Sequence, residues 1–106
     1  MRGEVLKGHL DLLLLSTVAD SPRHGYAIVD ELRRRSYGLF DLSEGTVYPA
    51  LYRLERGGLV ESRWSSETGR RRRVYSVTRR GRAELERLWR EWETFARGVE
   101  AVLAWT

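Results

Sequence analysis

The feature that most constrains the fold is an apolar repeat in the last quarter of the chain. Residues 79–105 predict one long helix, because large apolar side chains recur there at alternating steps of three and four. The seam consists of Leu85, Leu88, Trp92, Phe95, Val99 and Val102. Such a helix could fold back on the first helix of its own chain or pair with a second copy. A seam of 18 residues with bulky aromatics exceeds what a small helical core needs, and this favours a dimer.

The N-terminal region predicts a second apolar helix over residues 4–19. Its wide stripe consists of Val5, Leu6, Leu10, Leu13, Leu14 and Val18, and Leu12 and Leu15 widen it further. A helix that is apolar nearly all round is usually buried on two sides. We therefore expect one side to pack on the core and the other, with Leu6 and Leu10, to meet a partner.

Two further helices are expected over residues 24–36 and from residue 44 to the Gly pair at 57–58. In the first, Tyr26, Ile28, Val29 and Leu32 are expected inside and Arg33, Arg34 and Arg35 in solvent. In the second, Ser43 is a candidate N-cap and Gly57 a candidate left-handed terminator. The inner face consists of Val47, Leu51 and Leu54. Pro49 would kink this helix unless its first turn is irregular around Gly45.

Two short strands with alternating patterns follow, over residues 59–65 and 72–78, and Gly69 lies at the tip of the hairpin between them. Three helices followed by a β-hairpin predict a winged helix-turn-helix. The predicted fold is therefore mainly α with a small β-hairpin. We expect a DNA-binding domain over residues 1–78 and a C-terminal dimerisation helix over residues 79–106.

The third helix has an exposed face that suits DNA. This face offers Ser43, Thr46, Tyr48, Pro49, Tyr52, Arg53 and Arg56. Hydroxyls and the amides of a helix N-terminus bind phosphates, and Arg binds guanine or phosphate. The alternative is an ordinary solvated helix face with half-buried Tyr side chains, which periodicity alone does not exclude.

Four consecutive arginines lead from the hairpin loop into the second strand: Arg70, Arg71, Arg72 and Arg73. On an ordinary strand such a run would be a solvated edge that resists aggregation. Beside a DNA-reading helix, phosphate binding is the better interpretation. Of the 19 basic residues, 18 are Arg, whose planar fork of donors suits phosphate and guanine edges, while the net charge of +4 is not diagnostic by itself.

The composition argues against an enzyme, a metalloprotein and a membrane protein. The chain has no Cys and only two His, of which His9 lacks acidic partners at metal-binding spacing and His24 suits a helix cap. We see no nucleophile, base and orienting group in a recognisable arrangement, and we expect no cofactor. The apolar stretch near the N-terminus is too short to span a bilayer, so a soluble cytoplasmic protein is expected.

Three segments together resemble the PadR family of bacterial transcriptional regulators. They are "LKGHLDLLLLSTVADSPRHGYAIVDELRR", "LSEGTVYPALYRLERGGLVES" and "GRRRRVYSVTRRGRAEL". The most specific parts are "HGY" after a Pro turn, "GTVYPAL" with "RLE", and the "YSVT..G" exit from the hairpin. The single C-terminal helix is similar to the smaller subfamily.

This resemblance implies a homodimer that binds double-stranded DNA at a palindromic operator, and repression relieved by a small aromatic effector. It implies that Ser43, Thr46, Tyr48 and Pro49 face DNA, with Tyr26 near phosphate and Arg70–Arg73 in the wing. It makes Trp89, Trp92 and Trp105 candidates for binding the effector, although side chains of this kind more often simply fill the dimer interface. Activation instead of repression, and a winged helix that docks a protein instead of DNA, remain the alternative interpretations.

Overall fold

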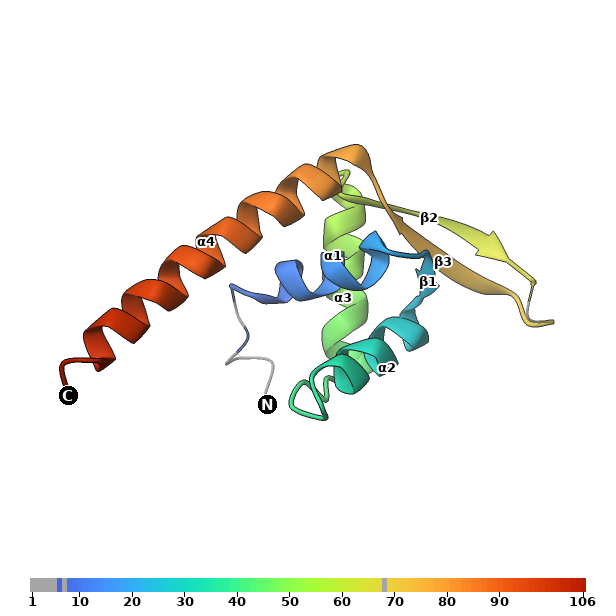
Figure 1. Ribbon diagram of the computed structural model, residues 1–106. Helices are drawn as coiled ribbons and strands as arrows, with labels where there is room; N and C mark the ends of the chain where they lie inside the picture. The colour runs from blue at the N-terminus through green and yellow to red at the C-terminus, as the bar shows by residue number, and fades with distance from the viewer. Residues whose placement is uncertain (1–5, 7, 68) are drawn as a thin grey trace.

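The computed structural model describes residue 6, residues 8–67 and residues 69–106. The elements follow the order helix, short strand, helix, helix, strand, strand, helix (Figure 1). They are α1 (Leu10–Ala19), β1 (Arg23–His24), α2 (Gly25–Arg35), α3 (Glu44–Arg56), β2 (Val60–Ser65), β3 (Arg72–Val77) and α4 (Arg79–Leu103). The predicted fold, mainly α with a hairpin and a long C-terminal helix, is confirmed.

The core lies where α1, α2 and α3 meet the base of the hairpin. The fully buried side chains are Leu14, Leu15, Val18, Ile28, Val47, Leu51, Leu54 and Val60, with Thr17 among them. Thr17 enters this apolar layer because its hydroxyl donates to the carbonyl of Leu14 at 2.7 Å, which satisfies it locally. The predicted inner face of α3 is therefore confirmed, and so are Ile28, Val29 and Leu32 of α2.

The first helix is shorter than predicted, because α1 begins at Leu10. Gly8 has a φ of +92°, which a continuing right-handed helix does not allow. Leu6 nevertheless returns to the core and is buried within its own chain. Residues 4, 5 and 7 of the predicted helix lie outside the described residues.

The hairpin belongs to a three-stranded antiparallel sheet of order β1-β3-β2, and the sequence did not predict β1. Only two residues form it, Arg23 opposite Tyr75 and His24 opposite Val74. A strand of two residues has no alternating pattern to detect. The pairing of β1 with β3 holds the start of α2 against the middle of the β2–β3 hairpin, which is the wing.

The junction between wing and α4 explains the "YSVT..G" segment. The Thr78 hydroxyl donates to the Gly58 carbonyl at 2.7 Å and accepts from the Gly81 amide at 3.0 Å, so Thr78 caps α4. A Cβ at residue 81 would lie 2.0 Å from the Leu59 carbonyl oxygen, so only Gly permits this approach. The first turn of α4 is thereby locked against the base of β2.

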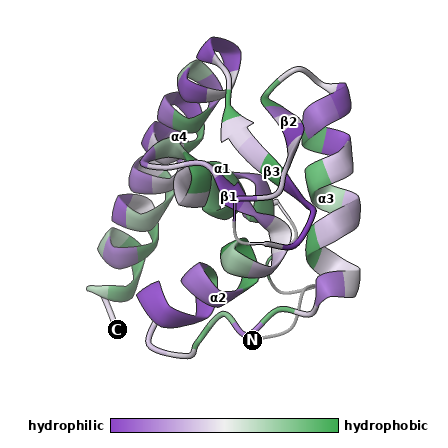
Figure 2. Ribbon diagram, turned by 90° about the vertical axis from the view of Figure 1, so that its right-hand side faces the viewer, coloured by the Kyte–Doolittle hydropathy of each residue, from purple (hydrophilic) through white to green (hydrophobic). Residues whose placement is uncertain are grey.

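From this junction α4 extends away from the sheet, and only its first half packs on the helical core (Figure 1). Leu85 and Leu88 lie against the core cluster. Further along, Trp92, Phe95, Val99 and Val102 are exposed. The helix carries hydrophobic and strongly hydrophilic residues along its length (Figure 2). The apolar seam therefore divides into a part that completes the core and a part that the described residues leave exposed.

Candidate nucleic-acid interface

Both ends of α3, the helix that carries the predicted DNA-binding face, are capped. The Ser43 hydroxyl accepts from the Thr46 amide at 3.3 Å, which confirms Ser43 as the N-cap. At the other end the amides of Gly58 and Leu59 donate to the carbonyls of Glu55 and Leu54, both at 3.0 Å. This is a Schellman motif, and its left-handed residue is Gly58 (φ +76°), not Gly57 as predicted.

Pro49 lies inside α3, and the irregular first turn expected around Gly45 is wrong, because the helix is continuous from Glu44. Proline has no amide hydrogen, so it cannot donate to the Gly45 carbonyl one turn earlier. Both residues lie on the exposed face of the helix. The exposed face of α3 therefore carries no bulky side chain at these two positions.

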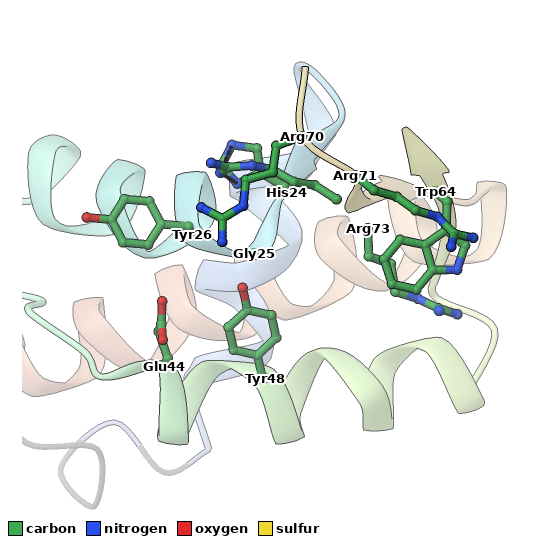
Figure 3. A pocket seen from close by; sticks show the side chains of 10 residues that line it. His24, Gly25, Tyr26, Glu44, Tyr48, Trp64, Arg70, Arg71 and Arg73 are labelled. Atoms are coloured by element: carbon green, nitrogen blue, oxygen red, sulfur yellow. Dashed lines mark hydrogen bonds between the residues drawn. The ribbon is translucent and has the colours of Figure 1, made fainter. Parts of the chain in front are cut away.

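Tyr48 is held against the beginning of α2. Figure 3 shows its ring rising from α3 toward Gly25. A Cβ at residue 25 would lie 2.4–2.6 Å from two ring carbons and the hydroxyl oxygen of Tyr48, so the glycine of the "HGY" segment creates the space that this phenol occupies. The partial burial raises the pKa of the Tyr48 phenol, which therefore stays protonated and can donate a hydrogen bond.

An open cleft lies between the start of α2, the start of α3 and the wing (Figure 3). It is lined by His24, Gly25, Tyr26, Glu44, Tyr48, Trp64 and Arg70–Arg73. Tyr26 is 57% exposed at its edge, so the expectation that it packs inside is wrong, whereas its expected place beside a bound phosphate is compatible with this exposure. The start of α2, the start of α3 and the arginines of the wing, all predicted to contact DNA, thus line one cleft.

The four wing arginines divide into two sets. Arg71 and Arg73 lie on one side of the hairpin, with their guanidinium carbons 4.5 and 5.4 Å from the centre of the Trp64 ring. Arg72 lies on the other side, 3.2 Å from Nε2 of His24. This alternation follows from the pleat of a strand. Trp64 was not among the predicted site residues, and its position across the hairpin from Arg73 is the signal that could have found it.

Two of these arginines also join the wing to the helices. The Nε atom of Arg73 donates to the Ser62 hydroxyl at 2.7 Å, and Ser62 donates to Glu55 of α3 at 2.6 Å. Arg72 rests on His24, whose Nδ1 accepts from the Ala27 amide at 3.1 Å and caps α2. Burial, followed by the charge of Arg72, lowers the pKa of His24 and keeps the ring neutral for that role. Arg70 and Arg71 are left nearest the tip.

Arg53, expected to face DNA, forms a bidentate ion pair with Asp11 of α1. The two distances are 2.7 and 3.1 Å. Tyr52 is exposed, and the guanidinium of Arg56 lies 5.8 Å from the centre of its ring. Thr46 is partly buried and its hydroxyl pairs with that of Ser43 at 3.2 Å. Arg53 was predicted to face DNA, but in the structure its guanidinium is already paired with a carboxylate of the same chain.

The three tryptophans named as effector candidates do not gather at one place. Trp92 lies edge-on to His9, with ring centres 5.5 Å apart, and 6.2 Å from the ring of Phe95. A hollow of about 180 Å³ is lined by Gly8, His9, Leu12, Leu88, Glu91, Trp92 and Phe95. Trp105 is 92% exposed beyond the end of α4, and Trp89 is exposed on the helix surface.

Over the part of the chain that the structure describes, no cluster of three or more His, Asp or Glu side chains could hold a metal ion. None of the helices described is long and apolar enough to cross a membrane.

The sequence and the fold are both similar to known transcriptional regulators. Residues 14–87 match the Transcriptional regulator PadR-like family. The transcriptional regulator Rv3488 of Mycobacterium tuberculosis is 41% identical over 96 residues, which cover 91% of this chain and 87% of that protein. A transcriptional regulator from Clostridium thermocellum has a similar structure (TM-score 0.85, 30% identity, 92% and 96% of the two chains). So does a PadR family regulator from Clostridium difficile (TM-score 0.81, 33% identity, 90% and 98%).

Proposed function

The chain belongs to the PadR-like family of transcriptional regulators, which are DNA-binding proteins and not enzymes, and we propose that it is a homodimeric repressor of a palindromic operator. Its DNA-binding unit is residues 1–78 and its dimerisation helix is residues 79–106. As a regulator of transcription, it acts in the cytoplasm. The observation that carries the proposal is the shared cleft, where α3, the start of α2 and the arginine-rich wing converge.

In this proposal α3 enters the major groove, and Tyr52, Pro49 and Thr46 meet base edges or the adjoining backbone. Ser43 and the first amides of α3 hold one phosphate, which the positive end of the helix dipole favours. Tyr26 and Tyr48 contact the backbone at the cleft. Arg70 and Arg71 lie at the tip of the wing, where they reach the flanking phosphates.

The dimer is proposed from the uncovered part of the seam. Trp92, Phe95, Val99 and Val102 expose apolar surface along one helix, and burying such a surface against a second copy removes it from water. A two-fold dimer would place two copies of α3 about 34 Å apart, which is one turn of DNA. We propose that Leu10, Leu85 and Leu88, which pack partly on the core, border this interface.

We further propose that a small aromatic effector releases the repressor from DNA by binding beside Trp92. The hollow next to this ring is lined by the aromatic rings of His9, Trp92 and Phe95, and its carboxylate, Glu91, is already paired with Arg87. Stacking on an indole suits a flat ligand of cationic or phenolic character.

The experiment that tests the function is selection of bound duplexes from a random DNA pool, followed by titration of the enriched duplex at several salt concentrations. We expect a palindrome with half-sites about one turn apart and a salt slope that corresponds to several phosphate contacts. Repression is then measured by transcription from a promoter that contains the enriched site. Enrichment of no sequence, with only weak salt-sensitive binding, would overturn the proposal in favour of a protein-docking module.

A further inference from the structure

The ion pair between Arg53 and Asp11 points to a role for Arg53 that differs from a DNA contact. We propose that Arg53 is a positioning residue: with Asp11 it braces α3 against α1, and the surface of α3 that contacts DNA is the stripe of Gly45, Pro49, Tyr52 and Arg56, in which Arg56 contacts a phosphate. This inference rests on the proposed function and deepens it.

The geometry of the pair distinguishes it from an ordinary surface contact. Both guanidinium Nη atoms of Arg53 bond to the two carboxylate oxygens of Asp11, at 2.7 and 3.1 Å. Bidentate pairs fix orientation as well as distance. Asp11 is only 31% exposed and lies in the first turn of α1, where the helix dipole favours a negative charge. Its carboxylate raises the pKa of Arg53 further above its usual range.

The pair also occupies a particular flank of α3. Gly45, Pro49, Tyr52 and Arg56 recur at steps of four, three and four, and all are exposed, so they form one stripe along the helix. On a helical projection Tyr48 lies on one side of this stripe and Arg53 on the other.

Each flank is attached to a different helix of the core. Tyr48 packs on Gly25 of α2, while Arg53 pairs with Asp11 of α1. A helix held at both flanks cannot roll about its long axis, and a roll would move every side chain of the stripe relative to the bases. The brace therefore acts on sequence discrimination and not on the number of phosphates bound.

The test compares two arginines of the same helix, Arg53 and Arg56, with titrations of the selected duplex and of a random duplex at several salt concentrations. For Arg53→Gln we expect about a tenfold loss of preference for the selected duplex, the size of one lost base contact, with an unchanged salt slope. For Arg56→Gln, the matched control, the slope should fall by about 0.9 because one phosphate contact is lost.

The decisive variants are on Asp11. If Arg53 positions the helix, Asp11→Asn should reduce preference as Arg53→Gln does, and the double variant should be no worse than either single one. The charge-reversed pair, Asp11→Arg with Arg53→Asp, should recover preference even though residue 53 is then an acid that phosphate repels. The proposal is overturned if Asp11→Asn leaves the preference for the selected duplex unchanged or raises it, or if the reversed pair has the lowest preference of all the variants, since neither result is compatible with a pair that positions α3.

A measurement on the protein without DNA tests the Arg53–Asp11 brace independently of the proposed function. In the free protein, Asp11→Asn should shift the backbone amide resonances of Gly45 and Tyr52, which Asp11 does not touch, if the pair holds α3 in place. Unshifted resonances would overturn the brace. A wild-type protein that prefers no duplex would overturn the proposed function instead, and the resonances would still decide whether Asp11 positions α3.

Discussion

The cleft and the outer half of α4 both expose aromatic side chains, but they differ in what surrounds them. In the cleft, Trp64 lies beneath two guanidinium groups, and Tyr48 fills the space above Gly25. Along α4, Trp92 has contacts with His9 and Phe95, and Phe95, Val99 and Val102 continue the same apolar seam into solvent. The first surface has charged and polar partners within the chain, and the second is an apolar face that the described part of the chain leaves exposed.

This difference indicates two kinds of partner. A surface whose charges are arranged by contacts within one chain suits a highly solvated polyanion, because binding then costs little reorganisation. An apolar helical seam gains nothing from a polyanion and is stabilised by another apolar seam. The cleft should therefore form in a single chain, whereas the seam should need a second copy.

The largest effect is expected from a charge in the seam. Phe95→Glu would bury an unpaired carboxylate in the proposed dimer, at a cost of about 3–5 kcal/mol, so the dimer dissociation constant should rise at least about 100-fold. Sedimentation velocity measures it. The control is Ala101→Glu on the opposite side of α4, which should leave the dimer intact. If the Phe95→Glu protein remains dimeric at micromolar concentration, the outer seam is not the interface.

The second effect concerns the packing that holds Tyr48. A methyl group on residue 25 would overlap the Tyr48 ring, so Gly25→Ala should lower the free energy of unfolding by about 1–3 kcal/mol. Urea denaturation at fixed protein concentration measures this change. In Gly45→Ala the new methyl has only an ordinary contact at 3.7 Å to Ser43, and stability should hold or rise by up to about 1 kcal/mol. Equal stabilities of the two variants would show that the Tyr48–Gly25 contact does not hold the cleft.

The third effect is electrostatic. Replacement of Arg70 and Arg71 by Ala should weaken binding to selected and random duplexes alike by about tenfold, and should reduce the salt slope by about 1.8, because two phosphate contacts are lost. Titrations at several salt concentrations measure both. The control removes the same charge from α4, with Arg90→Ala and Arg97→Ala, and should change neither quantity. Survival of affinity and slope in the wing variant would contradict the assignment of the wing.

The smallest effect is expected at Glu31, behind the cleft. Arg34, bonded to this carboxylate at 2.7 Å, and then Arg35 and Arg23 lower its pKa to about 2. Since the unfolded carboxyl titrates near 4.5, its contribution to stability is complete above that pH and is lost as the pH falls from there to about 2. Glu31→Gln should therefore lower the urea midpoint at pH 7, and the difference from the wild type should shrink across that window. A difference that stays constant through this window would mean that the ionised carboxylate contributes nothing.

The sequence predicted α2, α3, the hairpin and α4 to within one or two residues, because their apolar periods and caps are local signals. Among the features that it missed, three are not marked by an apolar period. The strand β1 is too short to carry a period, α1 begins late because Gly8 turns the chain, and Arg34 and Arg35 pair with Glu31 instead of being simply solvated. For the cleft, the residue types were predictable, but Trp64 was missed, because its role depends on its place opposite Arg73 in the hairpin.

By itself the sequence determined the winged arrangement, the family and the chemistry of the two exposed surfaces, since these depend on residue order, period and type. Only the tertiary structure decided which arginines are engaged within the protein. Arg53, Arg72 and Arg73 contact Asp11, His24 and Ser62, which lie between 11 and 48 residues away along the chain. The physical reason is that a guanidinium can donate to a carboxylate, a hydroxyl or a phosphate, so its role depends on which acceptor the fold places within reach.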